Sequence, residues 1–287
     1  MLKPRSVREV IQAGWFLYRR RFRFVLTASL SILFPYAMIA AYVQAHFTML
    51  SSDEMQQLMT DVGSNAQTSS LLSVLPHGSE IWFIVLGLMY MLLVVPLLQG
   101  ILVHMTAQIM LKKQDVTVSE AGNLAFRRLL PNVGTLVLVG LIYVFFIAVF
   151  TLIIFLIFSL LGSVSQALAS VIVVLGSIAL FIGVIWFLLR VSMVSLVVVE
   201  EHRSFFGAIR QSFRLTRDQA KRLFGFFVML FLICLVIETF LSLMGSVFFP
   251  SAGGGLMIDS LISIFLTPFA MLCMSVMYVD LRIRRGE

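Results

Sequence analysis

The chain has 287 residues, of which 60% are hydrophobic and only 12% are charged. Ordinary soluble domains have about 45 to 50% apolar and about 25% charged residues, so this composition excludes a typical soluble globular protein. The formal net charge is +7. Because the basic residues stand beside apolar stretches, where Lys and Arg attract anionic lipid, we expect membrane lipids and not nucleic acid as their partners.

The N-terminal segment is basic and amphipathic. Val10, Ile11 and Trp15 recur at helical spacing, opposite Arg8 and Arg19. This pattern predicts a helix that lies in the membrane interface, with its cations toward lipid headgroups. Besides Arg19 we expect Arg20 to contact headgroups.

Long apolar runs follow, without the alternation of polar and apolar residues that marks a strand. A hydrocarbon core of about 30 Å needs about 20 helical residues, and each run is long enough. The predicted spans are residues 22–47, 81–111, 133–161, 169–199, 223–249 and 256–279. Val43 and Ala45 fit a signal-peptide cleavage pattern, but the charged region before the first run is too long for such a peptide. We therefore expect an all-α polytopic membrane protein with six transmembrane helices.

Charge is distributed unequally between the connecting segments. All Lys and Arg residues except Arg190 lie in or beside the N-terminal segment, segments 112–132 and 200–222, or the C-terminal tail. The intervening segments 48–80, 162–168 and 250–255 contain neither residue. Basic segments stay in the cytoplasm, so the sequence predicts a bacterial inner-membrane protein with both termini cytoplasmic.

Two further basic segments resemble the first. Leu124 and its apolar neighbours precede Arg127 and Arg128, and Phe205, Ile209 and Phe213 oppose a second basic face. That face consists of Arg203, Arg210 and Arg214. We expect these arginines to contact lipid headgroups, although any basic loop beside a membrane can look amphipathic. Thr216 and Gln219 fit a capping box that would begin the fifth span.

The same order of segments thus occurs three times. Each unit has a basic amphipathic helix, an outward span and a returning span, over residues 1–111, 112–199 and 200–287. All units enter from one side, so the repeat would be parallel, about an axis along the membrane normal. We expect a single membrane domain.

Three ionisable residues fall within predicted spans: His104, Arg190 and Glu238. Such groups cost at least ~2.5 kcal/mol near the bilayer centre, which makes them candidates for an intramembrane polar site. At 1.5 Å per residue, Arg190 and His104 lie about 15 and 12 Å from the cytoplasmic ends of their helices, so these two are candidates to line one inward-facing cavity. Glu238 lies nearer the outer face. Structural roles for all three remain the alternative.

Signatures of soluble enzymes are missing from the sequence. It contains no HExxH, GxSxG, Walker, GxGxxG or CxxC pattern, and Cys234 and Cys273 stand singly inside spans. We therefore expect a protein that is not an enzyme and needs no cofactor or metal. An enzyme embedded in the membrane remains an alternative, because intramembrane active sites can lack these signatures, and facing positions of His104 and Glu238 would favour it.

The run Arg190-Val-Ser-Met-Val-Ser-Leu-Val-Val-Val-Glu-Glu, followed by Ala208-Ile-Arg-Gln-Ser-Phe-Arg-Leu-Thr, resembles the YciC-type family of uncharacterised bacterial inner-membrane proteins. Tyr278-Val-Asp-Leu-Arg-Ile-Arg-Arg is similar to membrane domains attached to some glycerophosphodiester phosphodiesterases. The resemblance implies a six-helix protein linked to envelope integrity and assigns no chemistry to any residue. The 287 residues contain no phosphodiesterase domain, so hydrolase activity is not implied.

Two functions agree with these patterns. In the first, the protein supports envelope organisation without catalysis, as a scaffold or as the partner of another membrane protein. In the second, it is a carrier or channel for a lipid, an ion or a small solute, and uses His104, Arg190 and Glu238.

Overall fold

The computed structural model describes residues 6–46, 78–112, 114–162, 166–248 and 252–286, and every regular element in these ranges is helical. Within them, six stretches are long and apolar enough to cross a membrane. They are Phe22–Ala40, Ile81–Lys112, Leu129–Ser159, Ser170–Glu200, Ala220–Gly245 and Ile262–Arg285. The prediction of an all-α polytopic protein is confirmed. Most of the predicted outer segment 48–80 lies outside the described residues.

The helices follow the predicted order. The first unit contains α1 (Val7–Arg20), α2 (Phe22–His46), α5 (Gly78–Met89) and α6 (Val95–Ala107), with π-helical turns at η1 (Tyr90–Val94) and η2 (Gln108–Lys112). The second contains α7 (Val118–Arg127), α8 (Leu129–Gly162), α9 (Gln166–Val191) and α10 (Val194–Glu200). The third contains α11 (Phe206–Thr216), α12 (Ala220–Phe248) and α13 (Ala252–Arg285). The three predicted amphipathic segments are the helices α1, α7 and α11.

Two of these amphipathic helices begin with a capping box. The backbone N–H of Ser6 donates to the Glu9 carboxylate at 2.7 Å, and that of Thr117 donates to the Glu120 carboxylate at 3.0 Å. The serine and threonine hydroxyls accept in return. The bond from the Thr117 backbone lowers the pKa of Glu120.

The capping box predicted at Thr216 and Gln219 is wrong. Thr216 is the last residue of α11, and its hydroxyl donates to the Ser212 carbonyl at 2.9 Å. Helix α12 begins only at Ala220. Thr216 thus satisfies a carbonyl of the preceding turn and does not cap the helix that follows.

The fourth predicted span, residues 169–199, is two helices. Helix α9 ends at Val191, and after a turn at Ser192 and Met193 the chain forms α10. In α10 every residue from Val194 to Val199 is buried within the protein. An apolar run of this kind buries equally well in lipid or in protein, so the break between the two helices is not visible in the sequence.

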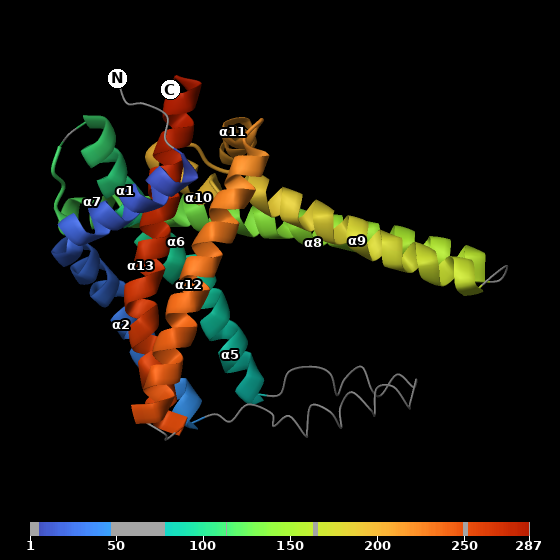
Figure 1. The fold of residues 1–287 in the computed structure, drawn as a ribbon, viewed down its shortest axis with the longest axis horizontal. Coiled ribbons are helices and arrows are strands. Elements are labelled where there is room, and N and C mark those ends of the chain that lie inside the picture. Colours follow the sequence, from blue (N-terminus) through green and yellow to red (C-terminus); the bar gives the residue numbers. More distant parts are fainter. Residues whose placement is uncertain (1–5, 47–77, 113, 163–165, 249–251, 287) are drawn as a thin grey trace.

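Most buried residues gather in one region, which we call the packed layer: α6, α7, α10, α11 and residues 271–281 of α13. Helix α13 also packs against α1, α2 and α12, which places it at the centre of the fold. At one position the approach is very close, because a Cβ added to Gly14 of α1 would lie 2.6 Å from the Cys273 Sγ. Figure 1 shows α1 lying across α13 at this level.

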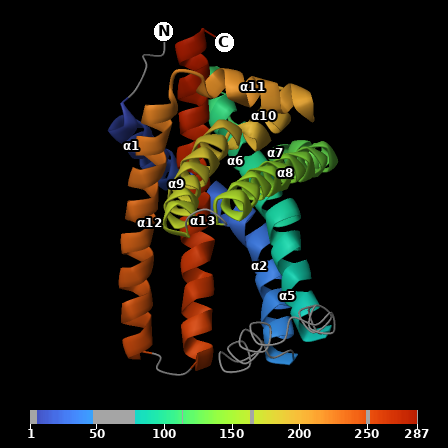
Figure 2. The ribbon, with the colours of Figure 1, turned by 90° about the vertical axis from the view of Figure 1, so that its right-hand side faces the viewer.

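Helices α8 and α9 form a hairpin that leaves the packed layer sideways. Figure 1 shows the hairpin running across the direction of α12 and α13, and Figure 2 views it from its end. No described residue in 136–159 or 170–191 is buried. The apolar pair α8 and α9 is therefore placed differently from the pair α12 and α13.

Candidate functional site

His104 lies on α6 and faces α10. Its Nδ1 is 3.3 Å from an oxygen of the Glu200 carboxylate, and both side chains are mostly buried. A polar pocket of about 430 Å³ opens beside it. The pocket is lined by His104, Gln108, Lys112, Gln114, Asp115, Val116 and Glu120. Part of its wall is the π-helical turn η2, a distortion that frequently marks functional sites.

Arg190 lies in the last turn of α9 and contacts α11. Its guanidinium stacks over the Trp186 ring, 5.2 Å from the ring centroid, and Nη1 donates to the Phe213 carbonyl at 3.5 Å. The Ser212 hydroxyl donates to the Arg190 carbonyl at 2.6 Å. The predicted intramembrane cation thus joins the base of the hairpin to α11.

Glu238 lies in the C-terminal half of α12 with its side chain exposed. It forms no hydrogen bond or ion pair with other described residues. The polar pocket includes His104, but neither Arg190 nor Glu238 lines it. In the described part of the chain, the three ionisable residues therefore occupy three separate environments and no common cavity.

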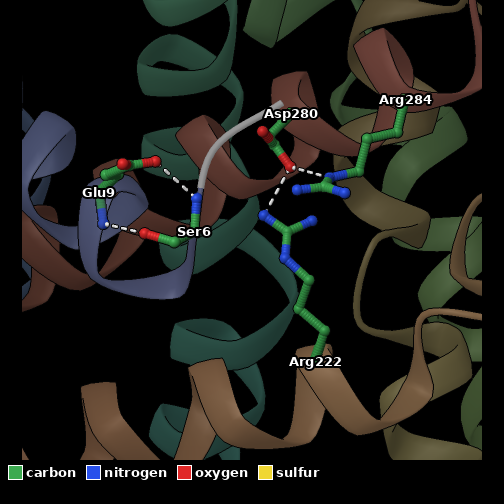
Figure 3. A network of polar contacts seen from close by, with 5 residues as sticks. All are labelled: Ser6, Glu9, Arg222, Asp280 and Arg284. Carbon is green, nitrogen blue, oxygen red and sulfur yellow. Dashed lines mark hydrogen bonds and ion pairs between the residues drawn. The ribbon is translucent and has the colours of Figure 1, made fainter. Parts of the chain in front are cut away.

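Sequence reasoning missed an ion-pair cluster at the C-terminal end of α13. The Asp280 carboxylate is only 2% exposed, and one of its oxygens lies 2.7 Å from Arg222 Nη2 of α12 and 2.9 Å from Arg284 Nε (Figure 3). Bonds between charged groups at these distances are among the strong hydrogen bonds of proteins. They tie α12 to the last turns of α13.

Glu201 forms the other half of this cluster. The Tyr278 hydroxyl donates to it at 2.9 Å, and Arg203 Nε lies 3.7 Å from its second oxygen. The Arg282 guanidinium is 4.0 Å from the first oxygen and lies over the Tyr278 ring. Glu201 and Asp280 are thus matched to cationic or phenolic partners, and Glu200 to the His104 imidazole, as a structural network requires.

The sequence carried one signal for this cluster. Glu200 and Glu201 close the first run used for the family resemblance, and the run that begins at Tyr278 contains Asp280 and Arg282. The two runs meet in space at the Tyr278 to Glu201 hydrogen bond. A partner 77 positions away cannot be assigned from one sequence, because helical spacing relates only residues three or four apart.

The arginines predicted to contact headgroups differ in their surroundings. Arg203 pairs with Glu201. Arg19, Arg20, Arg127, Arg210 and Arg214 are exposed, and Arg128 is half-buried. With Arg203, whose side chain is 53% exposed, six of the seven arginines therefore lie at the surface of the protein.

The chain matches no protein-family model, no curated protein and no solved structure. Its likeness to the YciC-type family stays a prediction. Function is therefore argued from the arrangement of its own residues.

Replacing Arg190 by alanine tests whether that residue is structural. The change removes a cation–π contact and a hydrogen bond to backbone, which together contribute about 1 to 2 kcal/mol. We expect the melting temperature of the purified protein to fall by roughly 2 to 6 °C, measured by fluorescence-detected unfolding in detergent. Arg190→Lys should retain part of the stability. An unchanged melting temperature in Arg190→Ala would contradict the structural role.

Proposed function

We propose that this chain is a non-enzymatic, multi-pass protein of a bacterial inner membrane, with both termini in the cytoplasm. In this proposal it supports envelope organisation as a scaffold that holds a membrane-protein partner and contacts anionic lipids. The charge distribution of the connecting segments and the family resemblance support the location. So does the end of α13, which lies toward the same side of the molecule as α1 (Figure 1).

One observation carries the scaffold role: a rigid packed layer holds a long apolar hairpin that has few protein contacts. The carboxylates of Glu200, Glu201 and Asp280 in and beside this layer each contact a partner side chain. The hairpin exposes large side chains along its length. Exposed apolar surface of this extent marks an interaction site for lipid or protein.

A second feature of the hairpin favours a helical partner. A Cβ added to Gly176 would lie 2.9 Å from Ile154, so this glycine serves the contact between α8 and α9. At Gly140, by contrast, nothing lies within 4 Å of an added Cβ, and the residue is exposed. Small residues let helices approach closely within membranes, so the α8 face around Gly140 can receive another helix.

Photo-cross-linking tests this role. A photoreactive amino acid is placed at Phe145 or Phe181 of the hairpin, or at Phe231 of α12 as a matched control, where the exposed fractions are 70%, 65% and 64%. We expect protein adducts of one defined mass from the hairpin positions and only lipid adducts from Phe231. Lipid adducts alone from all three positions would contradict a partner on the hairpin.

The proposed orientation predicts a labelling pattern. In a variant with Cys234→Ala and Cys273→Ala, single cysteines are introduced as Ser64→Cys or Gly286→Cys. A membrane-impermeant maleimide applied to spheroplasts should label the first variant and label the second only after lysis, because the basic C-terminal tail stays inside. Labelling of Gly286→Cys in intact spheroplasts would reverse the orientation.

A carrier or channel is the second candidate, and the three ionisable residues within the apolar stretches support it. Their separate environments favour the scaffold. Solute or lipid flux through reconstituted wild-type protein that disappears in Arg190→Ala with Glu238→Gln, while the fold is retained, would favour transport.

A further inference from the structure

An apolar groove lies between α1, the start of α2, α12 and α13. Its volume is about 720 Å³, and its lining is almost entirely hydrocarbon and aromatic. The Tyr18 hydroxyl in the wall donates to the Phe265 carbonyl at 3.3 Å and is thereby satisfied. The groove can therefore hold an apolar ligand without leaving the tyrosine hydroxyl unpaired.

Ring contacts fix the shape of the groove. Trp15 of α1 packs against Phe269 at 5.9 Å between centroids, and Phe22 stacks on Phe265 at 6.5 Å. Aromatic pairs at these separations stabilise one another beyond their buried area. The close contact of Gly14 with Cys273 holds α1 against α13 beside these rings. The groove is thus preformed, unlike the convex outer faces of the spans.

The length of the groove matches one leaflet of a bilayer. Along α12 its lining residues extend from Ile233 to Leu241, a rise of about 12 Å at 1.5 Å per residue. Half of a hydrocarbon core of about 30 Å is about 15 Å. Helix α1 lines one end, and from there the groove follows α12 and α13 toward the C-terminal end of α12. An acyl chain entering beside α1 therefore runs along the two spans.

The end at α1 carries free positive charge. Arg8, Gln12, Trp15 and Arg19 recur at steps of four, three and four residues, which places them on one face of α1. Trp15 thus lies beside these arginines, and the expectation that it lies opposite them is wrong. Gln12 and Trp15 line the groove, and the two arginines flank them. Both arginines are exposed, and neither forms a hydrogen bond or ion pair with the described residues. The apolar groove thus opens between two unpaired cations.

We propose that this groove binds one acyl chain of an anionic phospholipid, whose phosphate lies at Arg8 and Arg19. The inference deepens the lipid contact of the proposed function and rests on the membrane location proposed above. Arg19 and Arg20 were expected to play the same part, but on α1 their side chains point about 100° apart. The site therefore uses Arg19 and leaves Arg20 outside.

Native mass spectrometry of the full chain in detergent tests the site. Phosphatidylglycerol and phosphatidylcholine with identical acyl chains are offered, and the fraction of protein that retains one lipid is measured. We expect wild type to retain phosphatidylglycerol roughly five- to twenty-fold more, since each surface cation contributes a factor of about five. Arg8→Gln with Arg19→Gln should bring the ratio close to one, and Arg20→Gln with Arg23→Gln should leave it within about twofold.

A second pair of variants tests the groove itself. Ile237→Trp fills it, whereas Val236→Trp places the same ring on the adjacent face of α12, outside the lining. We expect retention of both lipids to fall about tenfold in the first variant and to stay unchanged in the second. If the melting temperature shows that Ile237→Trp does not fold, Leu266→Trp is a second variant that fills the groove.

Two results would overturn the proposal: equal losses from both arginine pairs, or wild-type retention in the filled-groove variants. Either would mean that lipid is held by diffuse charge. Cross-linking of a partner to the hairpin does not depend on the groove, so failure of the lipid site and failure of the scaffold role are distinguishable.

Discussion

Replacing Asp280 by asparagine is expected to lower the free energy of unfolding by about 3 kcal/mol. The carboxylate is almost fully buried, and it neutralises Arg222, itself only 15% exposed, together with Arg284. Removing one member of a buried ion pair leaves the remaining charges uncompensated, and measured costs are about 3 to 5 kcal/mol. The asparagine side-chain amide can still accept a hydrogen bond from an arginine, so we expect a loss at the lower end of this range. For a chain of this size the melting temperature should fall by roughly 6 to 12 °C.

Asp115→Asn is the matched control for this measurement. Asp115 also pairs with an arginine, Arg21, but its side chain is 77% exposed. Exposed ion pairs contribute at most about 1 kcal/mol, so the melting temperature should change by no more than a few degrees. Similar effects of the two substitutions, measured by fluorescence-detected unfolding, would show that the Asp280 cluster is not the buried structural network described above.

Replacing Gly14 by valine should detach α1 from α13. An added Cβ would meet the Cys273 Sγ at 2.6 Å and its Cα at 3.2 Å, and backbone cannot yield as a flexible side chain does. Overpacking costs about 1 to 3 kcal/mol. We expect a lower melting temperature together with faster proteolysis of the N-terminal segment. Because α1 forms one wall of the apolar groove, retention of phosphatidylglycerol should fall as well.

Gly122 of α7 provides the comparison, because nothing lies within 4 Å of a Cβ added there. Gly122→Ala should be neutral or stabilising by up to about 1 kcal/mol, as is usual in a helix interior. Cys273→Ala combined with Gly14→Ala removes the 2.6 Å contact and should recover part of the loss. Stability unaffected by Gly14→Val would contradict the close packing of α1.

Some parts of this fold are visible in the sequence because they depend on local patterns. The apolar runs predicted six stretches of the right length, since lipid-exposed helices need about 20 apolar residues. The positions Ser6 and Glu9, like Thr117 and Glu120, fit the capping pattern that both helices use, although only Thr216 and Gln219 were singled out. A Ser/Thr-x-x-Glu/Gln pattern therefore identifies a capping box only where a helix begins directly after the Ser or Thr.

Other parts depend on contacts between distant segments. The separation of α10 from α9 was missed because an apolar run is equally compatible with lipid and with a protein interior. The sideways course of the hairpin is set by packing at its base, including the hydrogen bond from Asn132 to Ser195. The role of the candidate site residues stays a prediction. His104, Arg190 and Glu238 were selected because they lie deep within predicted membrane spans. The structural network instead joins Glu201 to the end of α13.

The central claim is that the α8–α9 hairpin holds a protein partner, and co-purification tests it most directly. Tagged wild-type chain is isolated in a mild detergent beside Gly140→Leu, which fills the open position on α8, and Gly87→Leu, which fills an equally open one on α5. We predict one membrane protein at near-equal amount with wild type and Gly87→Leu, and its loss from Gly140→Leu. Wild-type protein that purifies with lipid and no partner would contradict the scaffold account.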